Sequence, residues 1–293
     1  MGKLLKNILD FFKKLFKVEE EPVVEPTTDS GDTYSAITIT IPDAVSGDTE
    51  PIEPTEPIVV GPTDPTLPNE SGFVSTMKIL IDNGHGNNTS GKRSPWSANK
   101  VKPEIEFYEY KWNREIAKPI VEELVKRGYD AELLVTEETD ISLTERVNRV
   151  NKICNDHGKN NVILVSVHSN AAGDGSAWMN GQGWEAYTTV GKTKSDKLAE
   201  CLYEEAEKIF TGKKIRKDTS DEDSDKEANF KIIYKSACPA VLTENFFYDN
   251  VDDVKYILSS EGRNAVIKTH VNGIIKYINY VEEQKLKYGY YKA

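Results

Sequence analysis

Two histidines follow apolar segments that have the composition of buried strands. His85 lies in NGHG, directly after KILID, and His168 ends the run VILVSVH. Ligands of open α/β sheets bind beyond the carboxyl ends of the strands, so two histidines delivered there can converge. Neutral imidazoles are ordinary zinc ligands. The pair therefore indicates a metal site, although for one such histidine a hydrogen-bonded residue that closes the strand is an equally good interpretation.

A catalytic zinc also needs a third protein ligand and a position left open for water. Three carboxylates stand at the entrance to the first long helix expected in the chain: Glu104, Glu106 and Glu109. The helix dipole favours a carboxylate in the first helical turn even without a metal. Spacing alone does not choose among the three.

A further carboxylate, Glu244, ends the apolar run PAVLT and has no packing reason to be there. If it faces the same cleft, it can accept a proton from attacking water and return it to a leaving amine. Partial burial would have to raise its pKa towards neutrality, against the effect of a nearby cation. The alternative is a carboxylate that caps the segment after the strand.

Apolar runs and helical periodicity alternate from Met77 onward and predict the elements that position these residues. Strands are expected at 77–82, 130–135, 162–168, 183–189, 230–234 and 240–245. Helices are expected at 109–127, 142–155, 195–210, 251–258 and 260–283, the first ending at Gly128 and the second starting with a capping box of Ser142 and Glu145. The alternation predicts an α/β three-layer sandwich, with a mostly parallel central sheet and helices on both faces.

The ordered motifs of this domain resemble those of the zinc-dependent N-acetylmuramoyl-L-alanine amidases of the amidase-3 type. They are NGHG, a glutamate followed by xxxNxxIA, VSVHSNA and PAVLTENFF. Each motif is weak alone, but four in the right order are specific together, and they cover about residues 77–280.

The resemblance implies a role for each candidate residue. His85, Glu109 and His168 would bind one zinc ion, and Glu244 would be the catalytic base. The xxxNxxIA context selects Glu109 over the two earlier glutamates. The implied reaction is hydrolysis of the amide bond between N-acetylmuramic acid and L-alanine in peptidoglycan. The alternatives are a zinc hydrolase of another amide or peptide, or a peptidoglycan-binding module without catalysis.

Two features depart from the pattern of similar amidases. Their first motif commonly reads DPGHG, and Asn83 stands here in place of the proline. The loop at 87–103 has no equivalent that we can assign. Both departures leave the ligands intact and concern contacts on the substrate side.

Several other polar and aromatic residues are weaker candidates. Asn170 could bind substrate, and Glu185 could contact the site residues without touching the metal or the substrate. The basic half of the loop at 211–229 could meet acidic wall polymers or peptide carboxylates, although a solvated loop is the simpler interpretation. Packing is the simpler role for three aromatic residues that could stack on sugar: Trp178, Trp184 and Tyr187. His157 and His270 are expected to be structural or exposed.

The first 75 residues are expected to form an appendage to the catalytic domain at 76–293. Residues 1–17 have apolar and lysine-rich faces, typical of a basic amphipathic helix that lies on a membrane surface, or docks on a protein. They are too short and charged to span a bilayer, and no signal-peptide pattern follows. Residues 18–75 hold nine of the thirteen prolines and are expected to be a disordered Pro/Thr/Glu-rich linker.

The charge distribution and the cysteine content exclude some classes of protein. Residues 1–76 carry a net charge of −9 and residues 77–293 only −2, so no concentrated basic face indicates a nucleic-acid partner. The three cysteines form no CxxC pair. The expected place of action is the cell wall or periplasm. Without an evident signal peptide, this fits a phage endolysin made in the host cytoplasm, or an enzyme held at a membrane surface.

Overall fold

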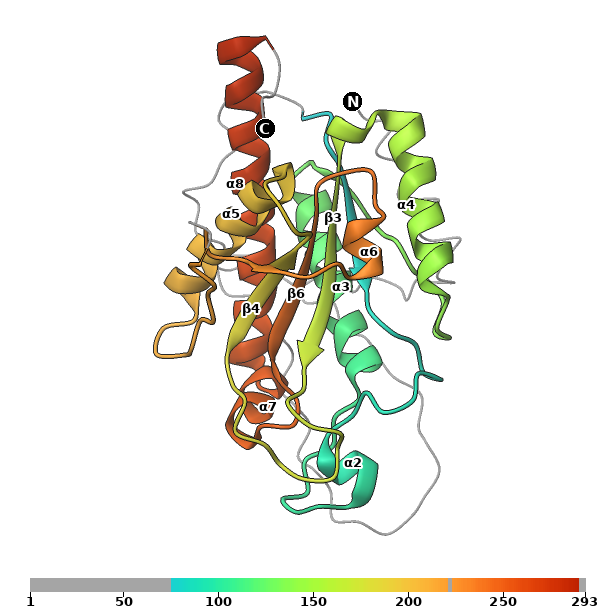
Figure 1. Ribbon diagram of the computed structural model, residues 1–293, viewed down its shortest axis with the longest axis vertical. Coiled ribbons are helices and arrows are strands. Elements are labelled where there is room, and N and C mark those ends of the chain that lie inside the picture. The colour runs from blue at the N-terminus through green and yellow to red at the C-terminus, as the bar shows by residue number, and fades with distance from the viewer. Residues whose placement is uncertain (1–74, 221–222, 290–293) are drawn as a thin grey trace, which may run out of the picture. The chain divides into compact units, whose positions relative to one another are not determined.

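Six strands form the central sheet in the part of the chain that the computed structural model describes, residues 75–220 and 223–289 (Figure 1). Their order is β2-β1-β3-β6-β4-β5. Neighbouring strands run parallel, except for the antiparallel pair β4 and β6. The strands are β1 Lys78–Asn83, β2 Asp130–Leu133, β3 Val162–Asn170, β4 Trp184–Thr188, β5 Lys226–Glu227 and β6 Ala240–Phe247. The predicted mostly parallel sheet is confirmed.

Helices cover both faces of the sheet and complete the three predicted layers. Figure 1 shows α6 in front of the strands, with α3 and α8 passing behind them. The helices are α2 Pro95–Asn99, α3 Glu109–Lys126, α4 Leu143–His157, α5 Lys194–Ile209, α6 Lys231–Tyr234, α7 Val251–Leu258 and α8 Ser260–Tyr288, with a 3-10 turn at Lys159–Asn161. Among these described helices, none has an apolar stretch long enough to cross a membrane.

Strand β3 separates two hydrophobic cores. Ile163, Val165 and Val167 pack with residues of α3, α5, α7 and α8 on one face. Val162 and Leu164 pack with residues of α4 and α6 on the other. Because side chains alternate along a strand, His168 continues the second set and lies on the face of α4 and α6.

The ends of the predicted helices follow their expected signals in part. Helix α3 ends before Gly128, whose φ of 88° is in the left-handed region that favours glycine. At the start of α4, Ser142 accepts a hydrogen bond from the Glu145 N–H at 3.1 Å. The Glu145 side chain pairs with Arg149 instead of closing the capping box. The complete capping box lies at the start of α5.

The strand predicted at 230–234 is wrong, because this segment forms helix α6. Ile232 and Ile233 are adjacent, yet both are buried in the same core as α4. Adjacent residues of a strand point to opposite faces, so only a helical turn brings both to one core. Phe230 and Tyr234, at the two ends of the turn, are exposed.

Three short elements were not predicted, the first of them the 3-10 turn at Lys159–Asn161. Strand β5 occupies the sheet edge beside β4, with only two residues. Helix α2 lies inside the loop at 87–103, where Ser94 caps its first turn ahead of Pro95. That loop packs against residues 171–183 through a hydrogen bond from Trp178 Nε1 to the Val101 carbonyl.

Two of the predicted N-terminal segments fall outside the part of the chain that the structure describes. The amphipathic helix expected at residues 1–17 and all but the last residue of the linker expected at 18–75 lie outside the described residues. The domain boundaries therefore stay predictions. His157 and His270 have the expected roles, since His157 is exposed at the end of α4 and His270 is buried within α8.

His270 connects α8 to the strand that carries Glu244. Its Nδ1 lies 2.7 Å from the Val266 carbonyl, so Nδ1 donates and Nε2 accepts from the Thr243 hydroxyl at 2.9 Å. Burial lowers the pKa of His270 to about 4, although the hydrogen bond to Val266 opposes this shift. The neutral ring is therefore the form that the folded protein stabilises.

We expect acid to destabilise the domain through this ring. A folded-state pKa below the unfolded value makes the contribution of His270 complete above about pH 6.5 and lost as pH falls towards 4, a change on the order of 3 kcal/mol. Urea unfolding between pH 7 and pH 4 should show a shallower loss of stability for His270→Gln than for wild type. The exposed His157→Gln variant serves as control, and equal slopes for wild type and His270→Gln would contradict the assignment.

Candidate metal centre

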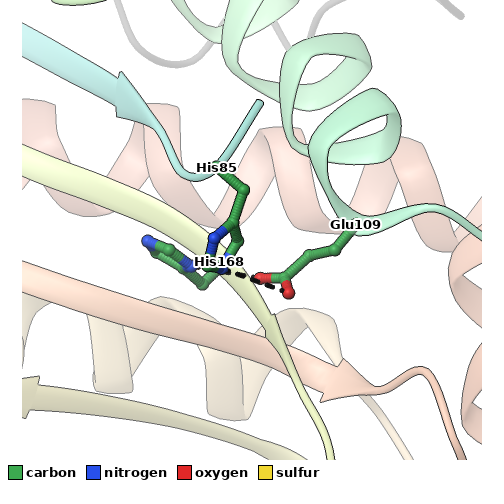
Figure 2. A group of neighbouring side chains, drawn as sticks. All are labelled: His85, Glu109 and His168. Carbon is green, nitrogen blue, oxygen red and sulfur yellow. Dashed lines mark hydrogen bonds and ion pairs between the residues drawn. The ribbon is translucent and has the colours of Figure 1, made fainter. Parts of the chain in front are cut away.

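The three side chains predicted as ligands meet at the carboxyl ends of β1 and β3 (Figure 2). His85 follows β1, Glu109 is the first residue of α3, and His168 lies on β3. Glu109 Oε2 is 3.3 Å from His85 Nε2, and Glu109 Oε1 is 3.0 Å from His168 Nδ1. Within the described residues no other group of three or more His, Cys, Asp or Glu gathers this closely, with ligand atoms within 4.8 Å of one another.

The donor set fits a divalent metal of the zinc class. Two imidazoles and one carboxylate are a recognised set for catalytic zinc. Glu109 is 1% exposed, and its Oε2 makes no hydrogen bond to any described residue. Burial alone would raise the pKa of Glu109, but the hydrogen bond with His168 and the charges of His85 and His168 lower it well below its usual range. The carboxylate is therefore ionised, as a metal ligand must be.

Glycine is required at position 84 because the His168 ring packs directly on the loop. A Cβ atom at Gly84 would lie 2.0 Å from His168 Cε1, which no real contact allows. The next residue, His85, has a φ of 66°, in the left-handed region that costs a non-glycine residue of order 1 kcal/mol or more. The surrounding structure must therefore hold this backbone in place.

Three side chains hold the loop through its backbone carbonyls. Asn113 Nδ2 donates to the Gly84 carbonyl at 3.1 Å, which gives the asparagine of the xxxNxxIA motif a positioning role. The His85 carbonyl accepts from Arg114 at 3.0 Å and from Arg146 at 3.1 Å. These bonds offset the backbone strain and fix the direction of the His85 side chain.

Arg146 is a positioning residue that the sequence reasoning missed. It is 2% exposed and forms ion pairs with Asp82 at 2.5 Å and with Asp140 at 2.9 Å. Asp82 also accepts from the Ser166 hydroxyl at 2.5 Å, so the network connects α4, β1 and β3. An arginine directly before Val147, on the apolar face of a predicted helix, was the available signal.

Asn83 departs from the proline of similar amidases without disturbing the ligands. Its side chain is buried, and its Oδ1 has no hydrogen-bond partner among the described residues. Its backbone carbonyl accepts from Arg146 Nη1 at 3.2 Å. The loop is thus anchored through its backbone at this position.

Glu244 lies beside the ligands, on the neighbouring strand β6. The β3–β6 register pairs it directly with His168, so both side chains point to the same face of the sheet. Its Oε2 is buried and makes no hydrogen bond to a described residue. Burial, reinforced by the charge of Glu109 and opposed by His168, raises the pKa of Glu244 to about 8. The direction agrees with the expectation for an acid–base residue.

A β-bulge directly after Glu244 connects it to His168 and Glu109. The register shifts between His168 and Asn170, and Phe246 adopts a left-handed φ of 65° while its ring is buried. Asn245 Nδ2 donates to the His168 carbonyl at 2.8 Å. The Ser169 N–H donates to Glu109 Oε1 at 3.1 Å. The bulge therefore sets the relative positions of both strand ends.

Asn170 and Glu185 form the next pair along the site. Glu185 lies directly opposite Glu244 in the β4–β6 register. Asn170 Nδ2 donates to Glu185 Oε1 at 2.6 Å, and Asn170 Oδ1 accepts from the Ala171 N–H at 2.8 Å. Both polar groups of the Asn170 amide are thus used within the protein, and its contact with substrate stays a prediction.

The remaining candidates from the sequence are two glutamates and three aromatic residues. The glutamates lie away from the cluster, and the aromatic residues pack within the protein. Glu104 and Glu106 are exposed and take no part in the cluster. Trp184 is fully buried against Tyr203 and Phe210, so it cannot stack on sugar. The three aromatic residues have the packing role that was the simpler interpretation, since Trp178 borders the same core and Tyr187 packs on Phe230.

A cavity of about 420 Å³ opens beside the two histidines. Its lining combines the apolar residues Ile141, Leu143 and Ile232 with Asp140 and the two histidines, His85 and His168. The cavity therefore offers space for a ligand next to the cluster of His85, Glu109 and His168.

The chain is similar in sequence to known proteins. The sequence profile of the family described as N-acetylmuramoyl-L-alanine amidase matches residues 79–276. N-acetylmuramoyl-L-alanine amidase CwlM of Bacillus licheniformis is 28% identical over 206 residues, which cover 69% of each chain. The endolysin of Bacillus phage SPP1 is 28% identical over 206 residues, covering 69% of this chain and 66% of that protein.

Solved structures agree with the fold. The crystal structure of N-acetylmuramoyl-L-alanine amidase from Clostridium difficile 630 superposes with a TM-score of 0.56 at 24% identity, covering 70% of this chain and 98% of that one. The family profile spans more than half of the chain. The chain belongs to the amidase-3 family of N-acetylmuramoyl-L-alanine amidases.

Proposed function

We propose that this protein is a zinc-dependent amidase that hydrolyses the bond between N-acetylmuramic acid and L-alanine in peptidoglycan. The observation that carries the proposal is the convergence of His85, Glu109 and His168, with the carboxyl group of Glu244 on the adjacent strand. Family membership supplies the substrate, and these four side chains supply the means of hydrolysis.

His85, Glu109 and His168 would hold the zinc ion. When bound, zinc polarises a scissile carbonyl and makes water more acidic. Hydrogen bonds within the protein fix Glu109 and the loop around His85, and so orient these side chains towards one another. Such support is typical of ligands that must be held in one orientation.

Glu244 would move the proton. Its carboxylate takes a proton from the attacking water and then donates it to the nitrogen of the departing L-alanine. A pKa raised to about 8 by burial suits the second transfer, in which the group must act as an acid. A neighbouring cation favours the carboxylate needed for the first transfer. One residue can therefore serve both steps.

A hydrolase explains the site better than a binding module does. Binding gains nothing from a buried carboxylate without a hydrogen-bond partner among the described residues, because such a group is costly to bury. A base placed beside three potential ligands has a use only if water is activated there. A zinc hydrolase of another amide would use the same residues and differ in substrate.

We expect Glu244→Gln to lower the turnover of purified peptidoglycan by about 10²- to 10⁴-fold, the contribution typical of a general base. The assay measures newly freed N-terminal L-alanine, and the exposed Glu106→Gln variant is the matched control. Zinc content should be unchanged. Wild-type turnover in Glu244→Gln would contradict its role, and release of sugar reducing ends without free L-alanine would indicate a glycosidase.

Metal analysis tests the ligands independently of activity. The wild-type protein should bind one zinc ion per chain, and His85→Ala and His168→Ala should each lose most of it, because two side chains rarely hold catalytic zinc. His157→Ala, at an exposed position, should bind zinc as the wild type does. Retention of stoichiometric zinc by both ligand variants would show that the ion binds elsewhere.

Residues 1–17 are proposed to hold the enzyme at a membrane surface near its substrate. An amphipathic segment with five lysines would bind anionic lipid through charge and apolar burial. The full chain should co-sediment with anionic vesicles, and Ile8→Asp with Phe12→Asp should abolish this while amidase activity in solution persists. Equal sedimentation of both forms would argue against the membrane role.

An endolysin-like role in cell lysis fits the phage relative.

A further inference from the structure

A second charged cluster lies beside the proposed catalytic residue. Glu185 is 1% exposed, and its carboxylate receives Arg216 Nε at 2.5 Å and Lys226 Nζ at 2.7 Å. It also accepts hydrogen bonds from the Tyr187 hydroxyl at 3.0 Å and from Asn170 Nδ2 at 2.6 Å. We define these two cations and this carboxylate, Glu185, Arg216 and Lys226, as the Glu185 cluster.

The Glu185 cluster lies on the same face of the sheet as the proposed metal ligands. Residues paired directly across adjacent strands point to the same side, and the registers pair His168 with Glu244 and Glu244 with Glu185. The three side chains therefore form a row across β3, β6 and β4. A substrate cleaved beside Glu244 extends over the cluster if it continues towards the β4 edge.

Two cations face one buried carboxylate in this cluster, so its three side chains together carry a charge of +1. Further acids nearby include Asp218, which interacts with Lys226, and Glu244, which interacts with Glu185. Burial opposes ionisation of Glu185, but Lys226 and Arg216 outweigh it and lower its pKa, so the carboxylate is charged. An excess cation beside a catalytic site attracts an anionic group of a ligand.

The cations, not the anion, form the accessible side of the cluster. The side chains of Arg216 and Lys226 are 28% and 23% exposed, whereas that of Glu185 is 1% exposed. The Arg216 guanidinium lies over the Phe247 ring at 5.2 Å. Its Nε donates to Glu185 at 2.5 Å, and among the described residues we find no acceptor, side chain or backbone, for its two terminal amino groups. A guanidinium fixed in this way can bind a carboxylate through two parallel hydrogen bonds.

The backbone around both cations is fixed to the sheet. The Arg216 N–H donates to the Trp184 carbonyl at 2.8 Å, and the Arg216 carbonyl accepts from the Tyr203 hydroxyl at 2.9 Å. Lys226 belongs to β5, which pairs with β4. Because these groups are already ordered, a ligand loses little affinity to ordering them.

We propose that Arg216 and Lys226, held in place by Glu185, form a subsite that binds a carboxylate of the peptide attached to the scissile amide. The subsite rests on the proposed function, which supplies a peptide on one side of the bond. Glu185 is a positioning residue that orients both cations. Its role explains why a buried acid lies so near the proposed base without acting on substrate itself.

The test compares two muramoyl-peptide substrates that differ only in whether the peptide carboxylates are free or amidated. The ratio of kcat/KM values gives the preference for the free acid. Arg216→Gln should reduce that preference by about 10- to 100-fold, mainly through KM, as expected for loss of charge-assisted hydrogen bonds. Lys217→Gln, which removes a cation of the same segment that pairs with Glu207, should keep the wild-type preference.

A double variant distinguishes binding of the substrate carboxylate by Arg216 from neutralisation of Glu185 by Arg216. If Arg216 only neutralises Glu185, the pair Glu185→Gln with Arg216→Gln should restore the preference, and that result would overturn the subsite. If Arg216 contacts the substrate, the preference stays lost in the double variant. Circular dichroism and thermal unfolding verify that each variant is folded.

A binding measurement keeps the two proposals distinguishable. Calorimetry with the free peptide should give tighter binding of the acid than of the amide, and Arg216→Gln should remove the difference. Preferential binding without any cleavage would support the subsite while overturning the amidase function. Cleavage of both substrates at equal kcat/KM by the wild type would overturn the subsite while leaving the amidase function intact.

Discussion

The carboxylate of Glu109 lies between the imidazoles of His85 and His168, and most of the surrounding structure serves to keep it there. A buried carboxylate stays ionised only where positive or hydrogen-bonding groups outweigh the loss of water. Both imidazoles and the Ser169 N–H meet that need. The same three side chains present nitrogen and oxygen atoms to a common point, which is what a divalent cation requires.

The positions of His85, Glu109 and His168 depend on buried polar groups that hold the neighbouring backbone. The strained backbone at His85 is held by Arg114 and Arg146, and the Gly84 carbonyl by Asn113. Arg146 is itself neutralised by Asp82 and Asp140. A buried arginine without its partners would cost several kcal/mol, so this network couples the stability of the fold to the geometry of the site.

Much of the architecture follows from sequence, but the contacts that tune the site do not. Apolar runs predicted five of the six strands, because a buried strand is visible in its own residues. The motif around Glu109 selected it over Glu104 and Glu106, because the motif residues are close to it in the sequence. Segment 230–234 has an apolar run too short to separate a strand from a helical turn, and the two-residue strand β5 has no periodicity at all. Packing against α4 makes residues 231–234 a helical turn and not a strand.

The partners of Glu185 could not be predicted from the sequence either. Arg216 and Lys226 are 31 and 41 residues away along the chain, within a segment whose composition resembles a solvated loop. Only the pairing of β5 with β4 brings Lys226 to the carboxylate. The sequence indicated a basic stretch and a buried acid separately, and the fold combines them beside Glu244.

Anomalous X-ray scattering from crystals of the zinc-loaded protein would test the central claim most directly. One zinc ion should lie at about 2.0–2.2 Å from one atom each of His85, Glu109 and His168, with Glu244 nearby but not bonded to it. A zinc ion found at another group of residues, or the three side chains too far apart to share it, would contradict the proposed chemistry.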